Sequence, residues 1–551
     1  MDFGVRKFRS LLFVATCGMG AEFLLALADT VIAGNLVGEI ALGGINLLQP
    51  IFNLVQFAAA LIGTGAAIRY SLETGRFERR RAHEMFSQGF WSVVIFGALL
   101  FALFVTGRET LLGFIGAAEE MTEAARQYWR WYAPCTFLLP LTLYLIALVY
   151  ADGDMVSCAL GYASLILGNI VASYFLCREF GVAGCAMGTV IGNTLAILSL
   201  FSHFLHKANT LKIVRHFSFA DLRLICKSSF ADASVSLCWS LLFFLLANLV
   251  VEEFGSKYLP VLSVVLVCIN LTLLFNGVSA AAQPIVGIYA GEMNALSIRR
   301  VMKAACWTAL IEGIIAAIFF ACVPSAAVRL VGISDPELVP IAEHAVRIVA
   351  LGFLGAPFVF LFNSYYLFVE RYALACSLTF VADIVVYAIF CLPAAHFFGM
   401  NGLWWSLGLA PAVAVSAFAL FVLSRYGRGR FPLLLSPARE SRQYSYSFAI
   451  NDREVERAAA FVSEVLEEKS GSGRDDVPSP SVTSDLIHRL AAAIAEKNPG
   501  KTVHAEVALD LTSGIKLLLR DDGKIFDLAA TTGTPGLHAV TMGYNRTLYV
   551  L

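Results

Sequence analysis

Residues 279–300 read SAAAQPIVGIYAGEMNALSIRR, and this stretch decides the fold class of the chain. An apolar segment ends in small residues and a proline, and a turn rich in arginine follows. Residues 63–81, GTGAAIRYSLETGRFERRR, form a weaker copy of the pattern. In each copy one glycine, Gly75 or Gly291, precedes the arginines. The two copies end the second and the eighth of twelve apolar segments, which indicates an internal duplication.

The composition of the whole chain agrees with a membrane protein. Of its 551 residues 58% are hydrophobic and only 15% are charged, and the mean hydropathy is +0.72. Soluble proteins have charged residues at about a quarter of positions. We therefore expect a polytopic membrane protein. The net charge of −1 carries no information about partners, because the charged residues of a membrane protein are distributed unevenly between the loops on its two faces.

The cysteines and the first apolar segment exclude some alternatives. Most of the twelve cysteines stand singly inside apolar runs without a Cys-x-x-Cys pair, so we interpret them as packing residues, with no metal site. The first apolar run continues from Leu11 to Ile32 without a cleavage motif, so we expect it to be a helix and not a cleavable signal peptide.

Twelve apolar segments approach the roughly 20 residues that a bilayer requires of a helix. We place these predicted spans at about 10–34, 43–70, 85–107, 126–150, 155–177, 183–206, 228–252, 258–290, 304–328, 343–369, 373–398 and 401–425.

Basic residues predict the orientation. Twenty Lys and Arg residues fall on the face that carries the N-terminus and the segment after the last span, against seven on the other face. The positive-inside rule therefore predicts that both termini lie in the cytoplasm. We expect a multi-pass protein of the plasma (inner) membrane.

The duplication can be tested by its offset along the chain. Three matches share nearly one offset: Gly181-Val-Ala-Gly184 with Gly399-Met-Asn-Gly402, Arg130 and Pro140 with Arg347 and Pro357, and Ala28-Asp29 with Ala247-Asn248. Membrane helices are rich in Gly and Pro, which explains single matches but hardly a shared offset. We therefore predict two six-helix halves in the same orientation.

This repeat sets the predicted domain organisation. Parallel repeats favour a central cavity between two lobes and alternating access by their relative movement. The predicted parts are an N-lobe at 1–206, a cytoplasmic inter-lobe loop at 207–227, a C-lobe at 228–425, a basic linker at 426–443 and a cytoplasmic α+β domain at 444–551.

Acidic residues within the spans are candidates for ion coupling, because they are costly in hydrocarbon. Glu22 and Asp29 are seven residues apart on the first span, close to two helical turns, so both point to one face. Such a pair suits proton uptake and release within one cycle. There are two alternatives to this coupling role. Asp29 lies near the outer membrane interface, or Glu22 takes part only in ordinary helix packing. Weaker candidates follow in the second half: Glu312, Asp383 and Glu370, the last expected to be a solvated helix end.

Several of these segments together resemble the multidrug and toxic compound extrusion (MATE) transporters over about residues 8–426. Three motifs carry the resemblance: Leu27-Ala28-Asp29-Thr30 before Gly34 in the first span, Gln283-Pro284-Ile285-Val286-Gly287 in the eighth, and Asn169 with Gly181, Gly184 and Thr189 in the fifth and sixth. The resemblance implies a secondary active multidrug antiporter that needs no cofactor.

The same resemblance implies a cation site formed by Asp29, Asn169 and Thr189. Ser173 stands where the family has a second acidic residue, and we infer that Glu22 compensates for it. The usual early proline is replaced near Phe13, and no acidic residue stands near Cys238 and Trp239 in the seventh span. These departures leave both H⁺ and Na⁺ open as the coupling ion.

The region after residue 444 differs in composition from the rest. It predicts strands at about 444–450, 503–509, 515–520 and 547–551, and two helices, of which the first has a stripe of Val455, Ala459, Val462 and Leu466. The sequence RDDGKIFD resembles the nucleotide box of the histidine-kinase-like ATPases, particularly anti-sigma-factor kinases, with Asp521 and Gly523 in the matching places. The helix at 483–496 has Ala491 where a magnesium ligand is expected, so we predict a regulatory domain without catalysis.

The combined prediction is a MATE-like antiporter that exports small organic compounds, spans the lipid bilayer and is not an enzyme. It has no nucleic-acid partner, and its C-terminal domain binds a regulatory protein. Two alternatives remain: a lipid-linked saccharide flippase and a membrane-tethered ATP-dependent protein kinase or regulator.

Overall fold

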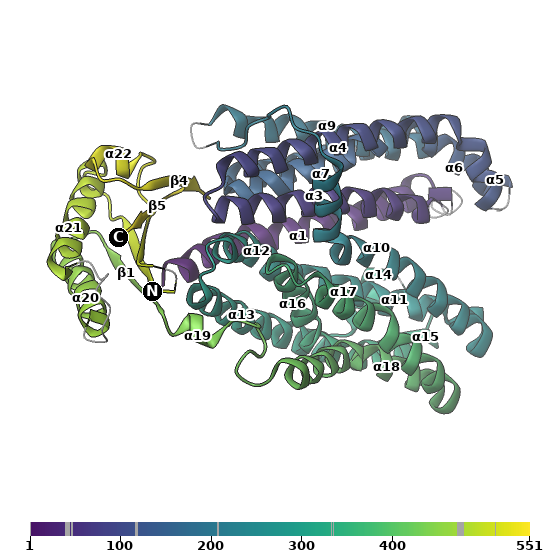
Figure 1. Cartoon of the computed structure of the whole chain (residues 1–551). Coiled ribbons are helices and arrows are strands. Elements are labelled where there is room, and N and C mark those ends of the chain that lie inside the picture. The colour runs from purple at the N-terminus through teal and green to yellow at the C-terminus, as the bar shows by residue number, and fades with distance from the viewer. Residues whose placement is uncertain are drawn as a thin grey trace.

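The computed structural model describes residues 2–551 except 39–43, 46–47, 116–118, 207–208, 332, 334, 471–478 and 513. Within the described helices, the side chains at 21–31, 33–35, 50, 111, 113–115, 119–121, 256 and 469–470 lie outside the description. A helical body occupies most of the molecule, and a small sheet with two covering helices lies at one end of it (Figure 1). We call that end of the helical body the domain-side end.

The N-lobe contains eight described helices. They are α1 (Phe3–Leu36), α3 (Gln49–Gly75), α4 (Arg79–Thr106), the short α5 (Arg108–Ile115) and α6 (Glu119–Tyr132), α7 (Cys135–Asp152), α8 (Met155–Phe180) and α9 (Val182–Leu200). Local sequence fixes their ends. Gly153 has a φ of 90°, which ends α7, and the carboxylate of Asp154 accepts the Ser157 amide at 3.0 Å, which begins α8.

The C-lobe begins with the long helix α10 (Phe219–Phe254), which starts well before the predicted seventh span. The helices that follow are α11 (Leu259–Asn270), α12 (Asn276–Gly291), α13 (Ala295–Cys322), α14 (Ser325–Val331), α15 (Leu338–Val349), α16 (Ala356–Phe368), α17 (Tyr372–Phe380) and α18 (Val386–Tyr426). Short 3-10 segments η3 (Leu271–Phe275) and η4 (Ala350–Leu354) interrupt two spans, and a π-helical turn, η5 (Val381–Val385), separates α17 from α18.

Ten stretches among the described residues are long and apolar enough to cross a membrane. The last of them, Tyr372–Tyr426, contains two of the predicted spans and is broken at Gly399, where φ is 63° and ψ is −152°. The first predicted span corresponds to α1, most of whose middle side chains lie outside the description. The number twelve therefore stays a prediction, while the helical membrane architecture is confirmed.

The backbone repeats between the two lobes. Residues with positive φ are uncommon outside glycine, and they recur here at nearly the offset that the sequence matches share. Four pairs have this conformation in both lobes: Gly38 and Gly255, Phe77 and Met293, Gly153 and Glu370, and Gly181 and Gly399. The local turns of the two halves therefore match in conformation even where the residue type differs.

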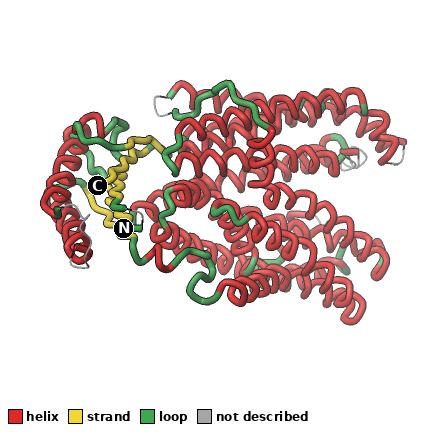
Figure 2. The backbone as a smooth tube through the Cα atoms, viewed as in Figure 1, coloured by secondary structure: helices red, strands yellow, loops and turns green. Residues whose placement is uncertain are grey.

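The C-terminal domain is an antiparallel sheet covered on one face by helices (Figures 1 and 2). Its strand order is β1-β2-β3-β5-β4, with strands at Gln443–Ala449, His504–Asp510, Lys516–Asp521, Tyr544–Val550 and Leu537–Thr541, respectively. Helices α20 (Asp452–Ser470) and α21 (Pro480–Lys497) pack on it, and α19 (Pro437–Glu440) and α22 (Leu528–Thr532) are short. The predicted stripe of α20 is buried as expected. Strand β4 was not predicted.

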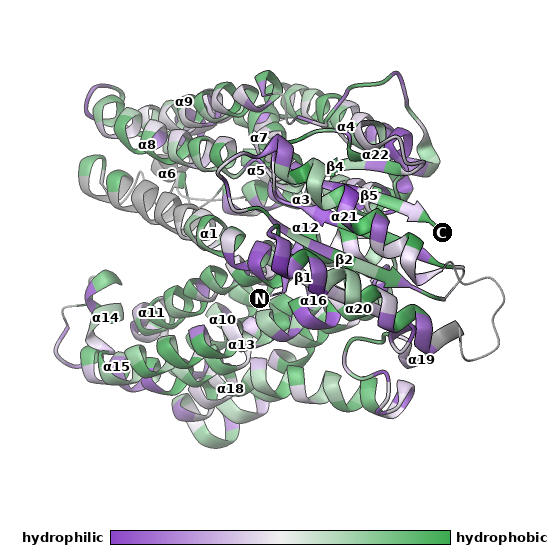
Figure 3. Ribbon diagram, turned by 90° about the vertical axis from the view of Figure 1, so that its left-hand side faces the viewer, coloured by the Kyte–Doolittle hydropathy of each residue, from purple (hydrophilic) through white to green (hydrophobic). Residues whose placement is uncertain are grey.

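The sheet lies between its covering helices and the domain-side end of both lobes (Figure 1). Hydrophobic residues dominate the helical body, whereas hydrophilic ones gather on the C-terminal domain (Figure 3). The chain ends meet here: the ring of Phe3 packs against Tyr544 with centroids 5.2 Å apart. The predicted soluble domain is thus docked on the helices.

Candidate functional site

The predicted N-lobe site is partly assembled. Asn169 of α8 donates a hydrogen bond from Nδ2 to Oγ1 of Thr189 of α9 at 3.2 Å, and Ser173 donates to Asn169 Oδ1 at 3.4 Å. Asn169 and Ser173 are fully buried. Glu22 and Asp29 lie on α1, but their side chains are outside the described residues, so their place in this site stays a prediction.

The polar residues of this N-lobe cluster lie at a close helix crossing. A Cβ on Gly188 of α9 would lie 2.6 Å from the backbone nitrogen of Ser173, and one on Gly192 would lie 2.6 Å from the carbonyl oxygen of Leu165. Real Cβ atoms do not approach that closely, so only glycine allows α8 and α9 to touch here. The side chains of Asn169 and Ser173 are thus engaged in hydrogen bonds at the contact between α8 and α9.

The motif predicted in the eighth span lies on α12 and has a packing role. A Cβ on Gly287 would lie 2.7 Å from the ring of Phe368 and 2.8 Å from the Cβ of Ser71. Gly287 therefore lets α12 approach α16 of its own lobe and α3 of the other. Pro284 is buried inside the same helix, where it removes one backbone hydrogen bond, and Gln283 is half-buried.

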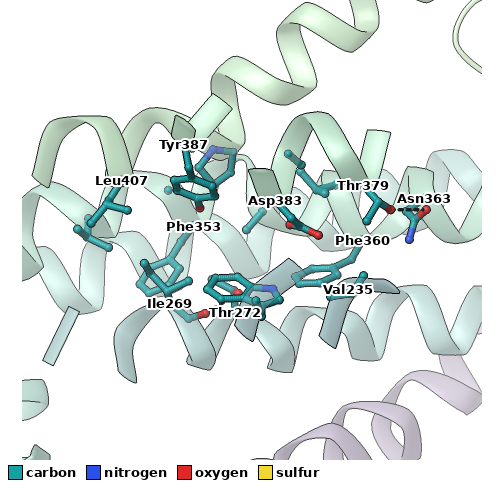
Figure 4. Close-up of a pocket in the computed structure, with 17 residues that line it drawn as sticks. Val235, Ile269, Thr272, Phe353, Phe360, Asn363, Thr379, Asp383, Tyr387 and Leu407 are labelled. Carbon is teal, nitrogen blue, oxygen red and sulfur yellow. Dashed lines mark hydrogen bonds between the residues drawn. The ribbon is translucent and has the colours of Figure 1, made fainter. Parts of the chain in front are cut away.

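A cavity of about 50 Å³ lies in the C-lobe between α10, α16, α18 and the non-α segments η3, η4 and η5 (Figure 4). Aromatic side chains form much of its wall, including Trp239, Phe360 and Tyr387. Its polar groups are few: Thr379 donates a hydrogen bond to Asn363 at 3.2 Å, and the carboxyl group of Asp383 points into the space between them and Phe353 (Figure 4).

Asp383 stands on the π-helical turn η5. Single π turns inside helices are rare and are frequent at functional sites. Among the described residues no hydrogen bond or ion pair holds this carboxyl group, and it is half-buried. A carboxyl group in that position is available to a proton or a cation. The sequence had indicated Asp383 only as a weaker candidate, because no motif surrounds it.

The cavity occupies the C-lobe position that corresponds to the N-lobe cluster. By the offset of the repeat, Trp239 corresponds to Glu22 and Leu407 corresponds to Thr189. Both Trp239 and Leu407 line the cavity. Where the N-lobe has amide and hydroxyl groups, the C-lobe therefore has an apolar wall and one carboxyl group, that of Asp383.

Two acidic residues differ from their sequence interpretation. Asp232 of α10 lies beside the Thr64 hydroxyl of α3, in the contact between the lobes, whereas no acidic residue had been identified near Cys238 and Trp239 of that span. Asp232 was missed because the acidic residue was expected near Cys238 and Trp239, which stand six and seven residues further along the same span. Glu370 is not simply a solvated helix end: it pairs with Arg69 at 2.5 Å and with Arg76 at 3.0 Å, both of the opposite lobe.

The lobes touch at the domain-side end. A Cβ on Gly75 would lie 2.9 Å from the Cα of Gly291, so the ends of α3 and α12 meet backbone to backbone. Arg81 of α4 pairs with Asp221 at the start of α10 at 2.9 Å. Together with the Glu370 pairs, these contacts close this end between the lobes.

Asp154, His203 and His206 form a cluster at the same end that could hold a metal ion. Both ring nitrogens of His203 face carboxylates, Asp152 and Asp154, each at 3.0 Å. That arrangement favours a protonated imidazole, which has no lone pair for a metal. Against the effect of burial, hydrogen bonds from Ser157 and the two histidines hold the pKa of Asp154 well below its ordinary value. Asp152 accepts the amide of Thr210 at 2.9 Å, so the cluster anchors the inter-lobe loop.

The predicted nucleotide box is a tight turn after β3. Asp521 is buried, and its Oδ1 accepts hydrogen bonds from the Gly523 amide at 3.1 Å and from Asn545 Nδ2 at 2.9 Å. Burial raises the pKa of Asp521 to about 6. Asn498 is also engaged, since its Oδ1 accepts the Lys524 amide at 2.8 Å. The residues after Gly533 form β4, and a nucleotide role for the turn stays a prediction.

Proteins of known structure share the arrangement of the helical body. A multidrug resistance MATE transporter of the MOP superfamily, in its outward-facing conformation, has a TM-score of 0.71 at 19% identity and covers 77% of this chain and 98% of its own. A MATE protein in complex with MaL6 gives 0.70 at 20% identity, over 77% and 98% of the two chains. A MOP transporter from Pyrococcus furiosus, described as having a binding pocket of reversed polarity, gives 0.71 at 19%, over 77% and 96%.

At these identities the likeness shows the fold of the helical body alone. A search of curated protein sequences gave no match. The MatE family model matches residues 16–175 and 233–393, one stretch in each lobe and together more than half of the chain. The chain therefore belongs to the MatE family of membrane transporters.

Proposed function

We propose that this protein is a secondary active efflux antiporter of the plasma (inner) membrane, which exports organic compounds in exchange for H⁺ or Na⁺. The proposal includes the twelve predicted spans, with both termini and the C-terminal domain in the cytoplasm, and makes the domain-side end the cytoplasmic gate. The contact of Gly75 with Gly291 means that this gate is closed. Alternating access then requires that α3 and α12 separate when the protein opens inward.

The observation that carries the proposal is the Asp383 carboxyl group in the C-lobe cavity. A cavity of about 50 Å³ holds a few water molecules or a small cation with part of its hydration shell. Sites for drug-sized molecules measure roughly 300–1,000 Å³. The cavity therefore suits the coupling ion, and Asp383 is the group that binds it.

The exported compound requires a larger space, which the proposal places between the lobes. Polar side chains from both lobes face each other there: Asn53 of α3 donates a hydrogen bond to Ser240 of α10 at 2.5 Å, and Asp232 lies earlier on the same helix, beside Thr64 of α3. Few charges and many aromatic residues suit an amphipathic organic cation. Asp232 would supply the counter-charge to that cation.

The test is ethidium transport by the purified full chain in liposomes, driven separately by a pH gradient and by a Na⁺ gradient. We expect one gradient to drive uptake and the other to fail. Asp383→Asn keeps the size of the side chain and removes its charge, so we expect transport to fall at least about 100-fold, because the C-lobe cavity then binds neither a proton nor a cation.

The matched control is Thr379→Val, which removes a polar group from the same cavity wall but no charge. We expect this variant to retain most of the transport rate. Gradient-driven ethidium uptake by correctly inserted Asp383→Asn protein would contradict the role of Asp383. Absence of uptake by the wild-type chain under both gradients would contradict export of organic cations.

A further inference from the structure

Two arginines of the C-terminal sheet have no explanation within the domain itself. Arg520 of β3 and Arg546 of β5 are fully buried, and they stand directly opposite each other in the sheet. Like charges at directly opposite positions destabilise a sheet. Burying two such charges requires more negative charge than Glu506, the cross-strand neighbour of Arg520, supplies alone.

The missing carboxylate comes from the C-lobe. Glu292, at the end of α12, pairs with Arg546 at 2.6 Å and also with Arg520. Its side chain is only 4% exposed, so the group of charges is almost completely removed from water. Such pairs resist separation, because removal of one partner leaves a buried charge uncompensated.

The N-lobe supplies the remaining acceptors. The guanidinium group of Arg546 donates hydrogen bonds to the carbonyl oxygens of Thr74 and Gly75, both at 3.0 Å. These carbonyls lie in the last turn of α3, where regular i to i+4 hydrogen bonding ends and the helix dipole is negative. One arginine of the domain therefore binds the end of α3 in one lobe and Glu292 in the other, at the point where Gly75 meets Gly291.

Further hydrogen bonds around Arg546 also join the C-terminal domain to each of the two lobes. In the N-lobe, Arg79 donates to the carbonyl oxygen of His538 at 2.7 Å and the amide of Phe3 donates to Ser447 at 3.0 Å. In the C-lobe, the amide of Ala295 at the start of α13 donates to Gln443 at 2.8 Å.

We propose that the C-terminal domain is an internal inhibitor that binds the closed cytoplasmic gate and must leave at least one lobe before the gate opens. The inference rests on the proposed alternating-access transport. Separation of α3 from α12 would pull the Thr74 and Gly75 carbonyls away from Arg546, or Glu292 away from both arginines. A ligand that binds one state better shifts the equilibrium toward that state. The linker between α18 and β1, residues 427–442, keeps the domain at a high effective concentration near the gate.

Hydrogen exchange of the full chain in lipid nanodiscs tests this inference without requiring transport. Glu292→Gln alters a lobe and leaves the sheet sequence intact, and Arg546→Gln alters the sheet. In both variants we expect amides of residues 68–76 and 286–292 to exchange about tenfold faster or more, because the gate opens more often once the buried charges are unbalanced. The double variant should add little to either single one, since both break the same group.

Arg489→Gln is the matched control, because Arg489 belongs to an exposed pair with Asp485 on α21. We expect the amides of residues 68–76 and 286–292 in this variant to exchange at the wild-type rate. Protected amides in β2 and β3 of Glu292→Gln would show that the domain is still folded. Unchanged exchange at the gate in that variant would overturn the proposal, as would slower ethidium transport by a correctly folded variant. Failure of the wild-type protein to transport ethidium would contradict the proposed substrate, not the inhibitory role of the C-terminal domain.

Discussion

The two lobes place different chemistry at equivalent positions of one backbone. In the N-lobe, Gly188 allows α9 to touch Ser173 of α8. In the C-lobe, the equivalent residues are Ser406 and Cys391, and the Ser406 hydroxyl lies 3.2 Å from the Cys391 sulfur. The C-lobe thus has two side chains in contact where the N-lobe has a glycine against Ser173. Next to them, Leu407 and Pro411 line the cavity that contains Asp383.

This difference shows how a duplicated fold acquires two kinds of site. Glycine closes the helix crossing in the N-lobe, so its amide and hydroxyl groups hydrogen-bond to each other. In the C-lobe a small cavity lies next to the equivalent positions, and the carboxyl group of Asp383 has no described partner in it. The chemistry of each lobe thus depends on residue size at the helix crossing as well as on the polar residues themselves.

The largest effect that we expect in this comparison is for Asp29→Asn. If the N-lobe contributes to ion coupling, removal of this carboxyl group abolishes gradient-driven efflux and leaves membrane insertion intact, because the amide has the same size but no charge. Glu22→Gln should weaken efflux by a smaller factor. Efflux at the wild-type rate in correctly inserted Asp29→Asn protein would assign coupling to the C-lobe alone.

A swap of residue size tests the helix crossings directly. Gly188→Ser forces a side chain into the contact with Ser173, and we expect it to lower the free energy of unfolding by about 3 kcal/mol. Ser406→Gly, the reverse change in the C-lobe, should cost about 1 kcal/mol, since glycine within a helix loses more backbone freedom on folding. Thermal unfolding followed by tryptophan fluorescence measures both. Equal costs would mean that the crossings do not differ in packing.

The smallest effect that we expect is for Asn169→Ala. Loss of the hydrogen bond to Thr189 should cost about 1 kcal/mol of stability. If Asn169 only joins α8 to α9, the apparent affinity for the driving ion stays unchanged. A shift of that affinity of about tenfold, measured in the liposome assay, would instead show that Asn169 coordinates the ion together with Asp29.

Much of the fold was predictable because it depends on local patterns. Apolar segments of bilayer length gave the helices, and the match of Gly181 with Gly399 identified a turn that has the same conformation in both lobes. Residues 283–287 pointed to the correct family because Gly287 is required at a crossing of three helices. Such requirements act through one residue and its neighbours, so they are visible in the sequence.

The C-lobe cavity and the docking of the C-terminal domain were not predictable in the same way. The cavity combines residues from segments as distant as Trp239, Asn363 and Leu407, none of which belongs to a motif. Arg520 and Arg546 lie in short strands, where charged residues usually indicate a solvated face. Only the position of Glu292, at the end of a helix in the other part of the chain, explains why both are buried.

The meeting of the chain ends has a consequence for biosynthesis. Phe3 is made before all helices from α3 onward, yet its ring packs on Tyr544 and its amide donates to Ser447. Strand β5 follows every membrane helix in the chain, and Arg546 within it completes the contact with α3 and α12. A chain whose membrane helices have all been inserted therefore still lacks the buried contact of Arg546 with α3 and α12 until β5 has been made.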